Sequence, residues 1–334
     1  MKIAGTSDLG RLAGLKRASA ETRAAMGKAA TEMTTGEKTS RLDATSGDIT
    51  RLFAVERAFD RNAAFSNTVA LAGSRLDMTQ NALGLILSPV QDLADGLATT
   101  AGMGDVAASL IHANRACEAF ADTVNALNTR AGGLSLFAGT ATDTAALAPA
   151  EMMLAELDTI AGAAGTAAEA IDAINAWFAP GGGFHASGYV GSADDLAPAD
   201  LGEGRRLDYA VRADAEELTE VLRAQALAAV VAGGAFAGNS GAQMEILDAS
   251  GVAMMSAREG LLDLRSAVGV SQETVENAKA ARTAEKDTLD LARNAIMSVD
   301  MGESATIYQA FETQLQTIYT VTARLGELSF VKYM

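Results

Sequence analysis

Apolar residues recur at alternating steps of four and three along the first third of the chain. Ten positions between residues 65 and 97 follow this rhythm without a break, and nine of them are apolar. The period predicts a helix from about residue 48 to residue 100, about 80 Å long, with a coiled-coil-like seam. The ten positions are Phe65, Val69, Ala72, Leu76, Thr79, Leu83, Ile86, Val90, Leu93 and Leu97.

Pro89 falls inside this predicted helix. Proline lacks a backbone donor and would kink a continuous helix. Alternatively, Ser88 caps a new helix with Pro89 in its first turn. The pattern does not distinguish these two interpretations.

Both ends of the chain carry the same rhythm. In the helix predicted over residues 300–332, six of seven seam positions are apolar: Ile307, Phe311, Gln314, Ile318, Val321, Leu325 and Leu328. The N-terminal tract repeats it with smaller residues: Leu12, Leu15, Ser19, Thr22, Met26, Ala29 and Met33. A further helix is predicted over 244–298, with its seam interrupted at Arg282 and Glu285.

The stretch "NTRAGGLSLFAGT", residues 128–140, ends a helix predicted over 105–130. Gly132 and Gly133 supply the left-handed conformation that a helix C-terminus favours. Residues 134–138 then alternate as in a short strand.

The texture changes between residues 141 and 242, where three of the four prolines fall. Helices are predicted over 151–178 and 214–231, a strand over 206–212, and a loop at "PGGGF". Trp177, Phe178, Leu207 and Tyr209 offer this segment a small core.

The predicted fold is therefore mainly α. Long antiparallel helices from both chain ends form a coiled-coil-like rod, and a small α/β middle domain is inserted. The predicted domains are 1–47 with 299–334 (terminal assembly helices), 48–140 with 243–298 (rod) and 141–242 (middle domain).

Composition excludes several classes of function. The chain has 26 Lys and Arg against 42 Asp and Glu, a net charge of −16, so nucleic acids and anionic membranes are poor partners. It has one cysteine and two histidines, which exclude an internal disulfide, a four-cysteine zinc site and a multi-histidine metal site. No uninterrupted apolar run is long enough for membrane insertion, and the start is unlike a secretory signal peptide.

The candidate chemical residues do not form a catalytic constellation, so we expect no enzyme and no cofactor. "APGGGF" lacks the Lys-Ser/Thr of a phosphate loop. His112 and His185 lack recognisable co-ligands, and Cys117 fits a small core residue. The carboxylate pairs Asp194–Asp195 and Glu216–Glu217 fit solvated faces or helix starts.

The terminal seams need a partner surface. Each buried methylene contributes about 0.8 kcal/mol, and isolated helices are marginal in water. The two arms either bury their apolar stripes against other chains or form an antiparallel hairpin within one subunit. Periodicity alone favours neither.

Three stretches resemble the bacterial flagellins and their relatives at the hook–filament junction. "EMTTGEKTSRLDATSGD" (32–48) resembles the family's turn between its first two helices, and "FETQLQTIYTVTARLGELSFVKYM" (311–334) resembles its C-terminal helix. "GGLSLFAGT" (132–140) is similar to the junction-type, hook-associated members, with Leu134 and Ser135 in place of their Arg and Tyr.

The resemblance implies a structural subunit of the flagellum, at the hook–filament junction, that assembles in a homo-oligomeric ring through its terminal helices. The implied partners are a neighbouring hook-associated protein, flagellin and an export chaperone, and the implied location is extracellular after export by the flagellar type III apparatus. The implied assembly residues are Ile307, Phe311, Ile318, Val321, Leu325, Leu328, Leu12, Leu15, Met26 and Met33. The alternatives are a filament flagellin and a cytoplasmic coiled-coil adaptor.

Overall fold

The computed structural model describes residues 4–331 of the chain, which are mainly helical. Backbone contacts divide the chain into two compact units, which are described separately. Unit 1 combines Met1–Ala63 with Thr283–Met334, and unit 2 is Ala64–Arg282. This division does not test the three domains predicted from the sequence, which remain a prediction.

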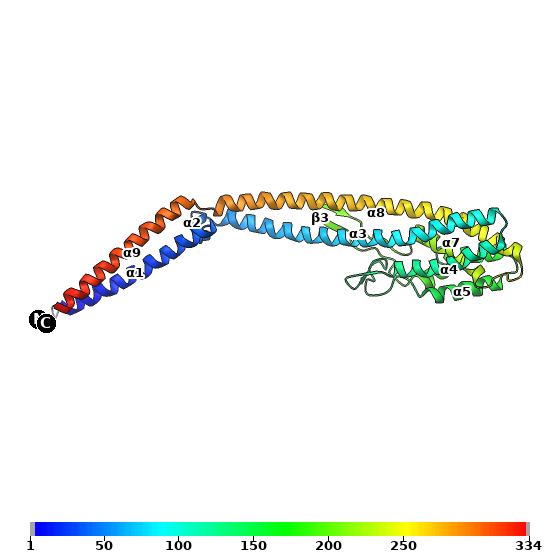
Figure 1. The fold of residues 1–334 in the computed structure, drawn as a ribbon, viewed down its shortest axis with the longest axis horizontal. Helices are drawn as coiled ribbons and strands as arrows, with labels where there is room; N and C mark the ends of the chain where they lie inside the picture. Colours follow the sequence, from blue (N-terminus) through cyan, green and yellow to red (C-terminus); the bar gives the residue numbers. More distant parts are fainter. Residues whose placement is uncertain (1–3, 332–334) are drawn as a thin grey trace. The chain divides into compact units, whose positions relative to one another are not determined.

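Long helices dominate the structure, and antiparallel pairing of helices from the two ends of the chain is confirmed (Figure 1). The helices are α1 Ala4–Thr35, α2 Arg41–Ala44, α3 Thr50–Gly102, α4 Val106–Leu127, α5 Ala150–Ala163, α6 Ala167–Phe178, the π-helix η1 Phe184–Gly188, α7 Glu216–Ala232, α8 Ser240–Met297 and α9 Met301–Val331. The strands are β1 Arg130–Ala131 paired with β2 Leu134–Ser135, and β3 Ala199–Gly202 paired with β4 Arg205–Leu207, both antiparallel.

The predicted seam of α3 is confirmed. Nine of its ten positions, from Val69 to Leu97, are buried, and Phe65 is half-buried. Within unit 2, α3 packs antiparallel to α8: Gly73 lies against Val275, Gln80 donates to the Arg265 carbonyl, and Gly251 lies against Leu97. Helix α3 runs through Pro89 as one helix, so the interpretation of a new helix capped by Ser88 is wrong.

Unit 2 holds one continuous hydrophobic core. Helix α4 packs mainly on α7, and α5 and α6 complete a small helical body. Trp177, Phe178 and Phe184 form an aromatic cluster in which the Trp177 ring meets both phenyl rings edge-to-face, with the Trp177 and Phe178 ring centroids 4.7 Å apart. Large buried side chains of this kind give a small body most of its stability.

Four local predictions were wrong. The helix predicted over 151–178 is two helices, because Thr166 caps α6 by accepting from the Glu169 amide while Glu169 accepts from Gly165, a capping box. Gly132 and Gly133, with φ of 58° and 86°, form the turn between β1 and β2, whereas α4 already ends at Leu127.

The two remaining errors concern the lengths of the two predicted strands. The predicted strands 134–138 and 206–212 are only two and three residues long, since β2 ends at Ser135 and β4 ends at Leu207. The loop predicted at "PGGGF" is present over residues 180–182, and only its end enters η1 at Phe184. The partner strand β3 was not predicted.

Tyr189 stabilises the loop that follows η1 through a hydrogen bond. Its hydroxyl donates to the Ser192 carbonyl at 2.7 Å, and burial, aided by the charge of Asp214, raises the pKa of Tyr189 to about 12. A phenol whose pKa is higher in the folded state stabilises the protein fully below about pH 10 and loses that contribution as pH rises towards 12.

We therefore expect Tyr189→Phe to lower the free energy of unfolding by about 1 kcal/mol at pH 8. The difference from the unsubstituted chain should narrow between pH 10 and pH 12. Urea unfolding followed at several pH values measures both. A difference that stays constant up to pH 12 would contradict the assigned hydrogen bond.

Candidate assembly surface of the terminal helices

Within unit 1, backbone hydrogen bonds join the residues after α1 to the residues before α9, at a point that we call the junction. The Lys38 amide donates to the Met297 carbonyl at 2.7 Å, and the Val299 amide donates to the Gly36 carbonyl at 3.0 Å. Gly36 has a φ of 72°, which lets the chain turn at the end of α1. From this junction α1 and α9 run antiparallel to each other (Figure 1).

Far from the junction, one polar contact joins the pair. The Arg23 guanidinium donates to the Tyr319 hydroxyl, with Nε 3.0 Å from the oxygen, and its Cζ lies 5.5 Å from the centre of the Tyr319 ring. The seam rule selects apolar residues at steps of three and four, so it gave no signal for this pair.

The α1–α9 pair buries little apolar surface. Among the described side chains of unit 1, the buried apolar residues are Ala29, Leu52 and Met297, and of these only Ala29 belongs to the pair. All other buried apolar side chains belong to unit 2. A helix pair with so few buried apolar groups is weakly stabilised by itself.

The predicted seam of α9 is divided between two rows. Phe311, Ile318 and Leu325 are half-buried. Ile307 and Val321 are 40% and 41% exposed, and Gln314, which lies between them at the same seven-residue spacing, is also exposed. The least exposed row of α9 follows a neighbouring phase: Ser304, Tyr308, Phe311, Leu315, Ile318, Thr322 and Leu325.

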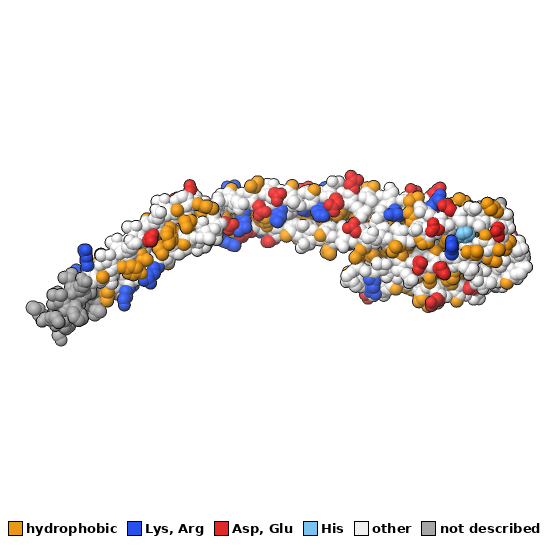
Figure 2. Space-filling view, viewed as in Figure 1, with side chains coloured by type: hydrophobic (Ala, Val, Ile, Leu, Met, Phe, Trp, Pro, Cys, Tyr) orange, Lys and Arg blue, Asp and Glu red, His pale blue; other side chains and the backbone are white. Residues whose placement is uncertain are grey.

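The predicted residues of α1 divide in the same way. Leu15 and Met26 are half-buried, whereas Leu12 and Met33 are 37% and 39% exposed. The side chain of Leu328 lies outside the described residues. Figure 2 shows apolar side chains gathered along the surface of this helix pair. The pair therefore presents apolar rows to its surroundings.

Charge is divided unequally between the units. Unit 1 contains 15 of the 26 Lys and Arg and 15 of the 42 Asp and Glu, which leaves 11 against 27 for unit 2. Unit 1 is therefore neutral, and the whole net charge of −16 belongs to unit 2. Copies of unit 1 can approach one another without net electrostatic repulsion.

The residues considered for chemistry stay apart. His112 lies half-buried against Gly96, and burial, followed by Arg115, lowers its pKa. Cys117 is half-buried rather than in the core, and burial raises the pKa of its thiol. Asp195 pairs with Arg212 at 3.1 Å, and Glu216 and Glu217 lie in the first turn of α7.

In the part of the chain that the structure describes, no three His, Cys, Asp or Glu side chains gather as a metal site requires. None of its helices combines the length and the apolar character needed to cross a membrane.

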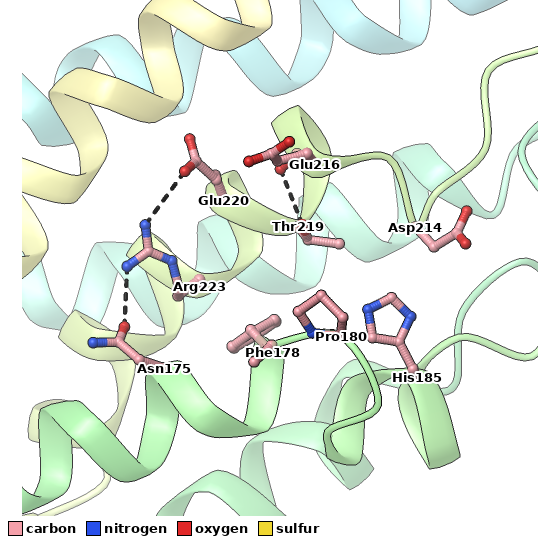
Figure 3. Close-up of a pocket in the computed structure, with 10 residues that line it drawn as sticks. Asn175, Phe178, Pro180, His185, Asp214, Glu216, Thr219, Glu220 and Arg223 are labelled. Atoms are coloured by element: carbon pink, nitrogen blue, oxygen red, sulfur yellow. Dashed lines mark hydrogen bonds and ion pairs between the residues drawn. The ribbon is translucent and has the colours of Figure 1, made fainter.

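A shallow cavity of about 440 Å³ lies between the end of α6 and the start of α7 (Figure 3). Arg223 lies between Glu220, at 3.7 Å, and Asn175, at 3.0 Å. Thr219 donates to the backbone carbonyl of Glu216. These interactions link the lining residues to each other or to backbone, so we assign the cavity no chemical role.

Comparison with known proteins bears on the C-terminal arm. Residues 253–334 match the family described as the bacterial flagellin C-terminal helical region. This segment contains the end of α8 and the whole of α9, and it confirms the resemblance seen in "FETQLQTIYTVTARLGELSFVKYM". A comparison with curated protein sequences found no match.

Two solved structures share the fold. The crystal structure of FlgL from Bacillus cereus has a TM-score of 0.51 and 14% identity, covering 72% of this chain and 100% of that one. A structure described as a flagellar hook-associated protein from Vibrio parahaemolyticus has a TM-score of 0.50 and 16% identity, covering 75% and 98%. At these identities the likeness concerns the fold.

Proposed function

We propose that this chain is a structural subunit of the bacterial flagellum, located at the hook–filament junction and joined to neighbouring subunits through its terminal helices. The observation that carries the proposal is the exposed apolar row of the α1–α9 pair in a neutral unit. The match of residues 253–334 to the flagellin C-terminal region and the fold shared with two flagellar proteins support it.

The apolar side chains of the α1–α9 pair are only partly buried within one chain. Fully burying one Ile or Val side chain contributes about 1.5–3 kcal/mol. Ile307, Val321, Leu12 and Met33 are each about two-fifths exposed, so burying the exposed part of all four would contribute about 2–5 kcal/mol that the single chain does not use. A polymer in which these rows meet neighbouring subunits would use this contribution.

The proposal extends to assembly and location. Subunits are exported by the flagellar type III apparatus, accompanied by a chaperone until they assemble as a homo-oligomeric ring between a neighbouring hook-associated protein and flagellin. The ten predicted assembly residues are part of this proposal, as is the division into terminal, rod and middle domains. The protein acts as a structural component rather than an enzyme.

Deleting the gene and imaging the cells by electron microscopy tests the location. We expect hooks without attached filaments, and complementation with an epitope-tagged chain should place the tag in a narrow zone at the hook end. A tag along the whole filament would instead identify a filament flagellin. The match of residues 253–334 to the flagellin C-terminal region also fits that alternative. Normal filaments in the deletion strain would contradict both.

A further inference from the structure

Residues 196–211, which we call the strap, leave the helical body of unit 2 and lie along its rod. The strap contains β3 and β4, and Figure 1 shows β3 against α3 and α8, away from α5 and α7. Ala199 and Leu201 are buried, whereas Arg205 and Arg206 are exposed. Leu207, Tyr209 and Val211 are half-buried against the core as well, so apolar contacts attach both halves of the strap, and its exposed part is the tip with the two arginines.

Arg212 closes the base of the strap. Its guanidinium donates to the Asp214 carboxylate at 2.7 Å and to the Asp195 carboxylate at 3.1 Å, and it also donates to the Ala193 carbonyl. These contacts hold the residues before and after the strap together. The base of the strap is therefore held by contacts that do not involve its tip.

The tip of the strap is the tight turn between β3 and β4. Gly202, Glu203 and Gly204 have φ of 90°, 57° and 75°, so three successive residues are in left-handed conformations. Glu203 and Gly204 are the two residues between the paired Gly202 and Arg205, and positive φ at both is the usual type I′ geometry of a two-residue hairpin turn, although Glu in place of the favoured Asn, Asp or Gly costs about 1 kcal/mol.

Arg282 of α8 contacts this turn. It is 5% exposed, its Nη2 lies 3.5 Å from Glu203 Oε1, and its Cζ lies 5.8 Å from the centre of the Phe65 ring. Arg282 also occupies the fourth place in a seven-residue series whose earlier members, Leu261, Val268 and Val275, are buried apolar residues. A polar residue at a seam position lowers stability and is typically kept for a specific contact.

We propose that the strap is a releasable cover on the rod, hinged at Arg212 and held at its tip by Arg282. Its release uncovers Phe65 and lets water reach the Arg282 guanidinium, while the helical body stays folded. The state of the strap therefore decides whether this part of the rod surface is accessible. This inference concerns the single chain and is independent of the proposed flagellar role.

Two glycines of the tip provide a matched test. A Cβ at Gly202 would lie 3.1 Å from Arg282 Nη1 and 3.3 Å from Phe65 Cδ2, whereas a Cβ at Gly204 would meet nothing within 4 Å. Gly202→Ala and Gly204→Ala thus share the backbone strain, and only the first disturbs the contact with Arg282. Trypsin reports release, because cleavage after Arg205 or Arg206 requires a locally mobile segment.

Mass spectrometry of the full-length chain under brief trypsin treatment should show cleavage at these two sites about tenfold faster in Gly202→Ala than in the unsubstituted chain. Gly204→Ala should change the rate less than about threefold. Equal acceleration in both variants would show that backbone strain alone controls the strap, and would overturn the role of Arg282.

Arg282→Met removes the contact between Arg282 and Glu203. It completes the apolar series of α8, so the unfolding temperature should stay the same or rise, while cleavage in the strap becomes about tenfold faster. Cleavage at the unsubstituted rate would overturn the proposal. If the variant instead unfolds early, Glu203→Gln at the exposed tip decides: faster strap cleavage supports the proposal, and an unchanged rate overturns it.

Discussion

Replacing Ile307 and Val321 together by Asp is expected to abolish incorporation of the chain into flagella while leaving the isolated chain folded. Both side chains are about two-fifths exposed, so the charges remain hydrated in the monomer and the free energy of unfolding should change by less than about 1 kcal/mol. Within an assembled contact the same carboxylates would be buried without partners, at a cost of several kcal/mol each.

The matched control is Gln309→Asp with Gln316→Asp. These positions are also exposed and also gain two negative charges, but they lie on the side of α9 away from its least exposed row. Incorporation is measured by complementing the deletion strain and probing purified hook–filament preparations for the chain. If Ile307→Asp with Val321→Asp incorporates as well as the control, the exposed row is not an assembly surface.

Phe311→Asp should lower the stability of the α1–α9 pair itself, unlike the substitutions at the exposed positions. Phe311 is half-buried and belongs to both the predicted row and the least exposed row of α9. Its replacement by a carboxylate therefore removes an apolar contact within the pair. The comparison separates loss of assembly through an unfavourable contact from loss through unfolding of the arm.

The sequence predicted the seam of α3 almost completely, because one apolar row ran for ten positions with a single polar interruption. The length of the apolar row explains this success. A one-residue error of phase would have rotated every Leu and Val of the row by about 100°, out of the seam. The continuity of the helix at Pro89 could not be predicted, because kinked and interrupted helices share the same pattern around a proline.

The seam of α9 shows why a shorter pattern is ambiguous. The predicted row and the least exposed row share Phe311, Ile318 and Leu325, and differ at the alternate positions. Large aliphatic residues at Ile307 and Val321 favoured one row in the sequence, whereas packing on α1 uses Tyr308 and Thr322 instead. The choice depends on the small side chains of the partner helix, which a pattern in α9 alone does not contain.

Errors in the middle segment have more local causes. Thr166 and Glu169 form a capping box that was present in the sequence and was not used. Strand β3 lacked any alternation long enough to detect, since it has four residues and gains its stability from contact with the rod. The contact at the tip of the strap joins Glu203 to Arg282, 79 residues further along the chain, and no local pattern contains such a pair.

The weakness of the α1–α9 pair leads to the second large effect. In the isolated chain, backbone amides of α1 and α9 should exchange with solvent at least about 100-fold faster than those of α3 between Leu76 and Leu97. The reason is the contrast in burial: Ala29 is the one buried apolar side chain described in the pair, whereas that stretch of α3 is buried along its whole seam. Hydrogen exchange followed by mass spectrometry measures both regions in one sample.

Assembly should then remove the contrast. In purified hook–filament preparations the amides of α1 and α9 should become protected, because burial of Ile307, Val321, Leu12 and Met33 against neighbouring subunits adds the stabilisation that the single chain lacks. The amides of Leu76–Leu97 act as the internal control, since they are protected in both states. Arms that exchange as slowly as α3 in the isolated chain would mean that one subunit already satisfies its terminal helices, and assembly would then need a different driving force.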